Sequence, residues 1–342
     1  MKALVTGAAG YVGSTVVSAL LDAGDDVVAL DDLSRGPARF VERVPHYVGD
    51  VADAGLLAAV FAEHPDIEIV IHCAALTLVS DSTAEPLRYY RENVVKAVAL
   101  FDTLLALGCT RVIFSSSAAV YGSSPPPLVA ETAPTEAASP YAATKLMVER
   151  ILDDVCAATP MSAVSLRYFN PVGADPRLRT GRYDDAPTDA LGALLAAATR
   201  GLPFRIHGQD WDTPDGTPIR DFVHVWDVAV AHVAAAHRWS AISVGGGHEI
   251  VNVGSGRGTS IRELAETVAR HRPGRLDIGY DARRSGDTVG CRADVRKARE
   301  LLGWEPQLRV DDAVRDAVRW AERRDAARVA DLDPRGGMVG SA

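Results

Sequence analysis

Short apolar runs alternate with helical patterns along the first half of the chain. Such runs, each of four or five residues, predict buried parallel strands. They are Lys2–Thr6, Asp26–Leu30, Ile69–His72, Arg111–Ser115 and Ala163–Leu166. Val16 and Leu20 share one face of a helix between the first two runs, and Asn93–Leu107 predicts a longer helix. This alternation predicts an α/β fold, in which a doubly wound, Rossmann-like parallel sheet is built with right-handed crossovers.

The pattern changes after Asn170. The polar stretch Asp175–Thr188, which contains Pro, Gly and three Arg, predicts a loop. Leu191–Arg200 predicts a helix and Phe204–Gly208 predicts a short strand. Ser260-Ile261-Arg262-Glu263 fits a capping box at the start of another helix. This half of the chain therefore predicts a smaller lobe made of short elements.

The change of pattern predicts three segments. Residues 1–170 are expected to form the Rossmann-like domain. Residues 171–325 are expected to form a smaller C-terminal lobe, interleaved with the last sheet strands at Phe222–Val225 and Glu249–Val253. Residues 326–342 are expected to form a flexible tail, because disorder concentrates at chain ends.

Composition narrows the class of protein. The net charge of −9 provides no basic field to collect nucleic acid or anionic lipid, so neither nucleic acid nor a membrane is an expected partner. Cys73, Cys109, Cys156 and Cys291 are far apart, so no disulfide framework and no metal site are expected. Met1–Gly7 reaches glycine too soon for a signal peptide, and no apolar run approaches the roughly 18 residues of a membrane span. A cytoplasmic protein with reduced thiols is expected.

A glycine-rich turn follows the first strand. Gly7-Ala8-Ala9-Gly10-Tyr11-Val12-Gly13 opens a helix, and such glycines let the backbone approach a pyrophosphate at a helix N-terminus. Asp31 ends the second strand 18 residues later and can bind a ribose 2′-hydroxyl. Asp31-Asp32 would repel a 2′-phosphate, which favours NAD over NADP, although Arg35 could accept that phosphate. Asp50-Val51 suits a contact with the adenine edge. The alternative is a tight turn without a ligand.

A second group of residues has the chemistry of proton transfer. Ser139-Pro140 starts a helix on which Tyr141 and Lys145 share a face at i, i+4. The ammonium should lower the pKa of the phenol from about 10 toward neutrality, so that Tyr141 can take a proton from a sugar hydroxyl. Ser117 follows the strand Arg111–Ser115 at the sheet edge where ligands bind, and it can bridge that hydroxyl and Tyr141. The alternatives are a surface helix pair and a serine-rich turn.

With these pieces in place, the sequence resembles the extended short-chain dehydrogenase/reductase superfamily and, more narrowly, the UDP-glucose 4-epimerase family. The resemblance covers about residues 1–322 in order. Three superfamily-wide stretches carry it: Val5-Thr6-Gly7 with the glycines, Phe114–Gly122, and Ser139-Pro140-Tyr141-Ala142-Ala143-Thr144-Lys145. The narrower stretches are Leu166–Ala174 (LRYFNPVGA), Thr213–Thr217 (TPDGT), Arg220–Val225 (RDFVHV) and Arg283–Asp287 (RRSGD).

The resemblance implies roles for the matching positions. The implied catalytic residues are Ser117, Tyr141 and Lys145. The implied NAD contacts are Gly7, Gly10, Tyr11, Val12, Gly13, Asp31, Asp32, Leu33, Asp50, Val51, Cys73, Ala74, Ala75, Asn93, Ser115, Tyr141, Lys145 and Tyr168. The implied UDP-sugar contacts are Thr77, Val79, Ser117, Ala118, Tyr141, Phe169, Asn170, Asp189, Leu191, Arg220, Arg284, Asp287 and Cys291. Two arginines can clamp a diphosphate and Asp287 can accept from a ribose hydroxyl, whereas Arg220-Asp221 could instead be a local ion pair.

The resemblance also implies a reaction: transient oxidation of a UDP-hexose at C4 by NAD, rotation of the 4-keto sugar, and return of the same hydride. Ala118-Ala119 argues against the related dehydratases, which carry acidic residues there. Three rivals stay open: 4-epimerisation of an unusual UDP-sugar (a modified hexosamine or a uronic acid), a net dehydrogenase or reductase, and a non-catalytic nucleotide sensor. A homodimer is expected.

Five positions depart from the epimerase pattern. Thr77 replaces a frequent Lys, Asp189-Ala190 replaces Asn-Asn, and His207 replaces an apolar residue. Cys291 occupies the position of a bulky Tyr in forms restricted to plain hexoses, and a small residue there goes with acceptance of N-acetylhexosamines. These departures concern the sugar and leave the C4 chemistry intact. The expected substrates are UDP-glucose and UDP-galactose, together with UDP-GlcNAc and UDP-GalNAc.

Overall fold

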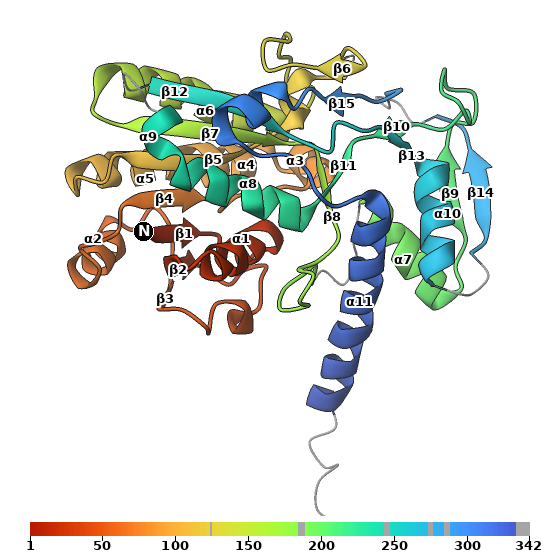
Figure 1. Cartoon of the computed structure of the whole chain (residues 1–342), viewed down its shortest axis with the longest axis horizontal. Coiled ribbons are helices and arrows are strands. Elements are labelled where there is room, and N and C mark those ends of the chain that lie inside the picture. Colours follow the sequence, from red (N-terminus) through yellow and green to blue (C-terminus); the bar gives the residue numbers. More distant parts are fainter. Residues whose placement is uncertain (124, 184–188, 243–246, 273–275, 284–287, 333–342) are drawn as a thin grey trace, which may run out of the picture.

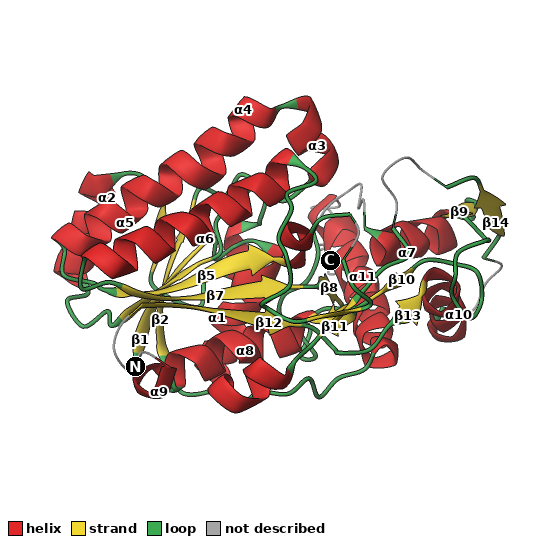
Figure 2. Ribbon diagram, turned by 90° about the horizontal axis from the view of Figure 1, so that it is seen from above, coloured by secondary structure: helices red, strands yellow, loops and turns green. Residues whose placement is uncertain are grey.

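A seven-stranded parallel sheet forms the centre of the molecule (Figures 1 and 2). The computed structural model describes residues 1–123, 125–183, 189–242, 247–272, 276–283 and 288–332. The strands lie in the order β12-β7-β5-β4-β1-β2-β3. Their bounds are β1 Lys2–Thr6, β2 Asp26–Asp31, β3 His46–Val48, β4 Ile69–His72, β5 Arg111–Ser117, β7 Ser162–Tyr168 and β12 Gly247–Val253. The predicted Rossmann-like fold is confirmed.

The five apolar runs of the first half all become strands of this sheet. The structure extends β2, β5 and β7 beyond the predicted ends, because hydrogen bonding to neighbouring strands continues past the apolar residues. The predicted strand Glu249–Val253 is confirmed as part of β12, which pairs with β7. Only β3 carries no apolar run, since His46 and Val48 are exposed at the sheet edge.

Helices cover both faces of the sheet (Figure 2). One face is covered by α1 (Tyr11–Asp22), α8 (Val225–His237) and α9 (Trp239–Ile242), which share one apolar core with the strands. The other face is covered by α2 (Ala54–Glu63), α5 (Lys96–Ala106) and α6 (Pro140–Ala158), which share a second core. The helix predicted over Asn93–Leu107 is part of a longer helical region. In the structure, α3 (Val79–Ala84), α4 (Pro86–Tyr89) and a π-helical segment, Tyr90–Val95, precede α5.

The C-terminal lobe lies beyond the carboxyl ends of the strands (Figure 1). Its helices are α7 (Ala190–Arg200), α10 (Ile261–His271) and α11 (Val310–Leu332), which pack around a third apolar core. Four pairs of short strands complete it: β8 (Asn170–Val172) with β11 (Phe222–His224), β9 (Phe204–His207) with β14 (Ile278–Asp281), β10 (Ile219–Arg220) with β13 (Thr259–Ser260), and β6 (Leu128–Val129) with β15 (Arg292–Ala293). The predicted helix and strand at Leu191–Arg200 and Phe204–Gly208 are confirmed. The capping box is confirmed too, since Ser260 Oγ accepts from Glu263 N at 3.0 Å and Glu263 accepts from Ser260 N at 2.8 Å.

Two expectations need correction. Phe222–Val225 is not a strand of the main sheet: β11 ends at His224, whose Nδ1 accepts from Trp226 N at 3.0 Å and so caps α8. Residues 326–332, which were expected in a flexible tail, belong to α11, and residues 333–342 lie outside the described residues. The stretch from Val310 to Leu332 contains neither Gly nor Pro, so no residue in it interrupts the helix. No described helix is both long enough and apolar enough to cross a membrane.

Candidate active site

The glycine turn brings backbone close to backbone at the start of α1. Gly7 has a positive φ of 66°, and a Cβ added there would lie 2.5 Å from Ala74 N. A Cβ on Gly13 would lie 2.1 Å from Gly7 O. No side chain caps Gly10 at the N-terminus of α1, and no acidic residue occupies the first turn. The first N–H groups of this helix therefore suit an anionic phosphate, and the residues fit a dinucleotide.

A cavity of about 340 Å³ opens beside this turn. Its lining contains nine of the residues expected to contact NAD: Gly7, Gly10, Asp31, Asp32, Asp50, Val51, Cys73, Ala74 and Ala75. It also contains residues that are not among the expected NAD contacts: Ser34, Arg35, Gly36, Gly49, Leu76, Arg88, Glu92 and Lys96. Of these, only Arg35 was considered from the sequence, as a possible acceptor of a 2′-phosphate. Ser34, Arg35 and Gly36 follow the expected contacts Asp31, Asp32 and Leu33 in the sequence, and this proximity is the signal that could have identified Ser34 and Gly36.

Asp31 organises the turn itself. Its two carboxylate oxygens accept from Ala9 N at 2.9 Å and from Leu33 N at 2.8 Å. Burial raises the pKa of Asp31, while these backbone N–H groups act in the opposite direction. The carboxylate at the end of β2 therefore holds the glycine turn beside the cavity that it lines.

The lining of this cavity also contains a cluster of charged side chains. Lys96 Nζ lies 2.7 Å from Asp50 Oδ2 and 2.5 Å from Glu92 Oε2. Burial alone would raise the pKa of Asp50, but the Lys96 ammonium and the Ala52 N–H outweigh it and hold that pKa below its usual value. Asp50 is therefore a carboxylate held by α5, at the place where an adenine contact was expected.

The predicted catalytic helix begins as expected. Ser139 Oγ accepts from Ala142 N at 3.2 Å, and Pro140 occupies the first turn of α6. Lys145 Nζ is buried, donates to Ser115 O at 2.7 Å, and lies 5.9 Å from the centre of the Tyr141 ring. Ser117 is the last residue of β5 and its hydroxyl hydrogen-bonds Tyr141. The structure thus brings Ser117, Tyr141 and Lys145 together.

The expected effect of Lys145 on Tyr141 is wrong for this structure. Burial raises the pKa of Tyr141, and the hydrogen bond with Ser117 only partly offsets that rise. Burial also lowers the pKa of Lys145 to about 8. The physical reason is that the ammonium is directed to the Ser115 carbonyl and to the Phe114 ring, at 4.8 Å, rather than to the phenol oxygen.

Three of the expected sugar contacts lie in one apolar cluster. Ala118, Phe169 and Cys291 pack together around Val120 and Ala293. Phe169 is buried, whereas Cys291 is partly exposed. These residues come from the ends of β5 and β7 and from the segment before β15, so the cluster joins the main domain to the lobe.

Asp221 ties Arg220 to this cluster. Its carboxylate is fully buried and accepts from Ser255 N and Oγ, both at 2.6 Å, from Gly256 N at 3.0 Å and from Ala293 N at 2.9 Å. Both oxygens of Asp221 are thereby engaged by donors other than Arg220, which disfavours the local ion pair as its main role. Asn170 Nδ2 donates to Asp221 O at 3.1 Å and joins the same junction. Arg284 and Asp287 lie outside the described residues.

Five further residues expected at NAD or at the sugar do not line the cavity beside the glycine turn: Tyr11, Val12, Thr77, Val79 and Asn93. Asn93 Oδ1 accepts from Leu76 N at 2.8 Å and Nδ2 donates to Thr144 Oγ1 at 3.1 Å, which fixes the loop before Thr77. Thr77 and Val79 are exposed on that loop and at the start of α3. Tyr11 OH donates to Gly173 O at 2.8 Å, whereas its neighbour Val12 packs against the core of the main domain.

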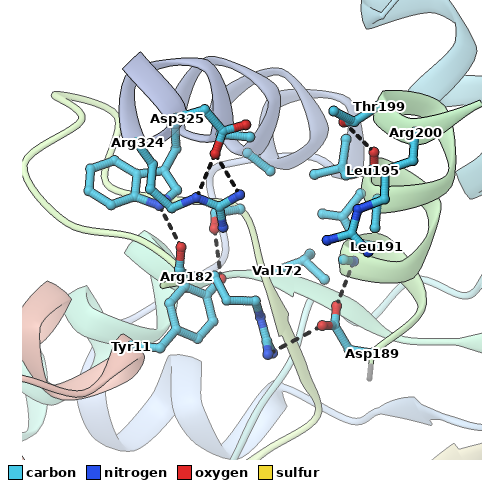
Figure 3. A pocket seen from close by; sticks show the side chains of 16 residues that line it. Tyr11, Val172, Arg182, Asp189, Leu191, Leu195, Thr199, Arg200, Arg324 and Asp325 are labelled. Carbon is cyan, nitrogen blue, oxygen red and sulfur yellow. Dashed lines mark hydrogen bonds and ion pairs between the residues drawn. The ribbon is translucent and has the colours of Figure 1, made fainter. Parts of the chain in front are cut away.

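A second cavity of about 190 Å³ lies between α7, α11 and the Gly173 turn (Figure 3). Asp189 and Leu191, both expected at the substrate, line this cavity rather than the one beside the glycine turn. Asp189 Oδ1 accepts from Gly192 N at 3.1 Å and thereby caps α7, while Arg182 Nη1 lies 3.3 Å from Asp189 Oδ2. Among the described residues, no group of three or more His, Cys, Asp or Glu side chains is arranged to hold a metal ion.

A parallel sheet with a glycine-lined cavity, and Ser, Tyr and Lys at its carboxyl edge, defines an extended short-chain dehydrogenase/reductase. Residues 3–254 match the model of the NAD dependent epimerase/dehydratase family, and the chain belongs to that family.

Within this family the chain is similar to 4-epimerases. A UDP-glucose 4-epimerase of Azospirillum brasilense is 42% identical over 322 residues, which cover 93% of this chain and 91% of that protein. The crystal structure of a UDP-glucose 4-epimerase from Stenotrophomonas maltophila, with bound NAD and formylated UDP-arabinopyranose, is 35% identical, with a TM-score of 0.91 over 96% of this chain and 99% of that one. The UDP-Glc/GlcNAc 4-epimerase of Campylobacter jejuni is 33% identical, with a TM-score of 0.82 over 94% and 99% of the two chains.

Proposed function

We propose that the chain is an NAD-dependent UDP-hexose 4-epimerase that interconverts UDP-glucose and UDP-galactose and also accepts UDP-GlcNAc and UDP-GalNAc. One observation carries this proposal: Ser117, Tyr141 and Lys145 meet at the carboxyl edge of the sheet, linked through Ser115 to Cys73 in the wall of the glycine-lined cavity. The absence of an acid at Ala118-Ala119 supports epimerisation over dehydration.

NAD is the cofactor, and it supplies the acceptor and later the donor of the hydride at sugar C4. The glycine turn, the N-terminus of α1 and Asp31 would hold its pyrophosphate and ribose, as their geometry fits these groups. Asp50-Val51 would face the adenine. A carboxylate at the end of β2 favours a free 2′-hydroxyl over a 2′-phosphate, so the retained dinucleotide should be NAD.

The chain's own residues handle the proton and the substrate. Burial keeps the phenol of Tyr141 protonated in the protein alone, so the positive charge of bound NAD would be needed beside it to favour the phenolate. In that state Tyr141 would take the proton of the C4 hydroxyl, directly or through Ser117, and would return it after the sugar has rotated. The Lys145 ammonium supplies a positive charge on the same helix as Tyr141, which would stabilise the phenolate form of Tyr141. Arg220, with Arg284 and Asp287, would hold the UDP, so that the 4-keto sugar alone rotates.

The cluster around Cys291 supports the wider choice of sugar. A thiol there is smaller than a tyrosine, and its neighbours Phe169 and Ala118 are also expected at the sugar. Residues 1–170 would then bind the cofactor and carry the catalytic groups, while residues 171–325 would bind the UDP-sugar.

We also propose that the enzyme is a cytoplasmic homodimer. Val95, Val98 and Met147 expose apolar side chains on the helical segment Tyr90–Ala106 and on α6, which contact each other on the outer side of the sheet (Figure 2). Such a patch suits an isologous contact between two copies. The four free cysteines suit a reducing compartment.

The test is incubation of the purified enzyme with the four UDP-sugars separately, followed by NMR of the products. Each sugar should give its C4 epimer at a rate that does not depend on added NAD and without accumulation of NADH. Stoichiometric consumption of NAD would identify a dehydrogenase instead. Failure to convert any of the four would contradict the proposed substrates.

A further inference from the structure

One face of α6 carries three polar residues spaced four positions apart: Tyr141, Lys145 and Glu149. The first two contact the end of β5 as part of the candidate active site. The third contacts the same strand, because Ser116 Oγ donates to Glu149 Oε1 at 2.5 Å. Ser116 and Glu149 are both buried. The face of α6 that carries the candidate catalytic residues therefore continues into a third contact with β5, away from the cavity.

A buried arginine holds the carboxylate of Glu149. Arg167 on β7 donates through Nε to Glu149 Oε1 at 2.9 Å and through Nη2 to Glu149 Oε2 at 2.6 Å. The side chains of Arg167 and Glu149 are 4% and 2% exposed, so the pair lies out of water. Two parallel hydrogen bonds from a guanidinium favour the ionised carboxylate and fix its plane. Glu149 is therefore a carboxylate with donors at both oxygens and a single orientation.

Arg167 is itself held from the other side. Its Nη1 donates to Tyr121 OH at 2.9 Å, and Tyr121 OH donates to Asn252 Oδ1 at 2.7 Å. Asn252 on β12 donates in turn through Nδ2 to Val129 O of β6 at 2.9 Å. Arg167 cannot turn away from Glu149 without giving up its bond to Tyr121. The negative charge of Glu149 is thereby kept in one place on α6.

This carboxylate acts on the Lys145 ammonium. Residues four apart on a helix have Cβ atoms about 5–6 Å apart, and an opposite charge at such a distance favours the ionised form of a group. Burial lowers the pKa of Lys145 to about 8, and the Glu149 carboxylate opposes this fall. Without the carboxylate, the ammonium would lose its proton at a still lower pH.

The other titratable groups around Lys145 carry no negative charge near pH 8. Burial lowers the pKa of His72, at the end of β4, to about 3, so its ring is neutral. Burial raises the pKa of the neighbouring Cys73 to about 11, and it also raises the pKa values of Tyr141 on α6 and Tyr168 on β7. The charge on Arg167 is positive and is paired with the carboxylate. Among these groups, Glu149 is therefore the source of negative charge for the ammonium.

We propose that Glu149 is a positioning residue of the active site, which holds the end of β5 against α6 through Ser116 and places a fixed carboxylate one helical turn from the Lys145 ammonium. The carboxylate keeps the ammonium charged to higher pH than burial alone would allow. The contact with Ser116 keeps its two neighbours in β5 in register with Tyr141 and Lys145. The effect on turnover rests on the proposed function, whereas the effect on the Lys145 charge does not.

The test is an NMR titration of Lys145 in the holoenzyme. The chain contains only four lysines, Lys2, Lys96, Lys145 and Lys297, so carbon-13 labelling of lysine Cε gives four signals, and Lys145→Arg identifies the one that belongs to Lys145. In Glu149→Gln this signal should titrate at least about one pH unit below the wild type, the lower end of the effect of a neighbouring opposite charge. The unpaired guanidinium of Arg167 acts in the same direction.

Two further proteins make this titration decisive. Asp154→Asn removes an exposed carboxylate of the same helix, which pairs with Arg150, and should leave the Lys145 signal unchanged. Breaking a buried ion pair is strongly destabilising, whereas replacing both partners by apolar residues is often neutral. If Glu149→Gln does not fold, Glu149→Met combined with Arg167→Met replaces it. The Lys145 signal should still titrate below the wild type in that double variant, because Glu149 acts directly on the ammonium.

Activity supplies the second readout. In Glu149→Gln the fall of kcat at alkaline pH should move to lower pH together with the Lys145 signal. Ser116→Ala keeps the carboxylate, so it should keep the Lys145 titration but lower kcat about tenfold, the scale of one buried hydrogen bond to a charged group, with KM unchanged. Ser116→Thr retains a hydroxyl and should recover the loss.

The results that would overturn the proposal are equally specific. One is a Lys145 signal that titrates as in the wild type in both Glu149→Gln and the double variant. The other is a wild-type kcat in Ser116→Ala. A wild-type protein that converts none of the four UDP-sugars, but whose Lys145 signal shifts as expected in Glu149→Gln, would contradict the proposed function and support the action of Glu149 on Lys145.

Discussion

The substitution Asp221→Asn tests whether the hydrogen bonds of Asp221, at the junction between the main domain and the lobe, hold in place the residues expected at the substrate. The carboxylate accepts four hydrogen bonds, two at each oxygen: from Ser255 N and Oγ at one, and from Gly256 N and Ala293 N at the other. An amide of the same shape keeps one acceptor oxygen and turns an NH₂ group toward the other two donors. Two buried donors are then left without a partner.

The magnitude follows from these contacts. Each orphaned buried donor costs about 1–3 kcal/mol, so the upper range for two is about 6 kcal/mol. Burial already raises the pKa of Asp221, which means that the ionised carboxylate is itself disfavoured, and removing the charge recovers part of that loss. We therefore expect Asp221→Asn to lower the free energy of unfolding by about 2–3 kcal/mol.

Urea unfolding at saturating NAD measures this change, with Asp66→Asn as the matched control. Asp66 is an exposed carboxylate that pairs with Lys2, so its loss should lower the free energy of unfolding far less than the loss of Asp221. The KM for the UDP-sugar should also rise in Asp221→Asn, because Arg220 and the segment of Cys291 lose their common anchor, while bound NAD should be unchanged. Equal unfolding free energies for Asp221→Asn and Asp66→Asn would refute the reasoning.

Three further predictions concern the chemistry. Tyr141→Phe should lose at least about a hundredfold in turnover, the scale of a general acid–base group, with UDP affinity unchanged by calorimetry; near-normal turnover would remove Tyr141 from its role. Activity should fall as pH rises through about 8, because the Lys145 ammonium loses its proton there, and Lys145→Arg should shift this fall to higher pH; an identical profile would contradict the assignment. Cys291→Tyr should lose about tenfold to hundredfold on UDP-GlcNAc alone, the cost of overfilling a pocket; equal losses on UDP-glucose would show that Cys291 faces away from the sugar.

The elements that the sequence predicts well are those whose pattern is local. The central strands are apolar in continuous runs. The start of α6 is signalled by the N-cap Ser139 and by Pro140, so the shared face of Tyr141 and Lys145 follows from helix geometry. The strand β3 was not predicted, because it is short, lies at the edge of the sheet and contains no continuous apolar run. The end of β11 at His224 depends on a cap to Trp226, which no apolar pattern signals.

The electrostatics of the site are less predictable, because they depend on distant parts of the chain. The spacing of Tyr141 and Lys145 suggests a lowered phenol pKa, but burial and the Ser115 carbonyl reverse that expectation. The four donors to Asp221 come from residues 255, 256 and 293, which only the fold brings together. Lys96 reaches Asp50 in the same way, across a separation that no helical spacing describes.

The central claim is that the hydrogen removed from C4 returns to the same carbon. NMR of a UDP-hexose brought to equilibrium by the enzyme in deuterated water tests it most directly. Internal return predicts that both epimers carry no deuterium at C4. Deuterium at that carbon would contradict transient oxidation with return of the hydride, because it would mean that the C4 hydrogen exchanges with solvent as a proton.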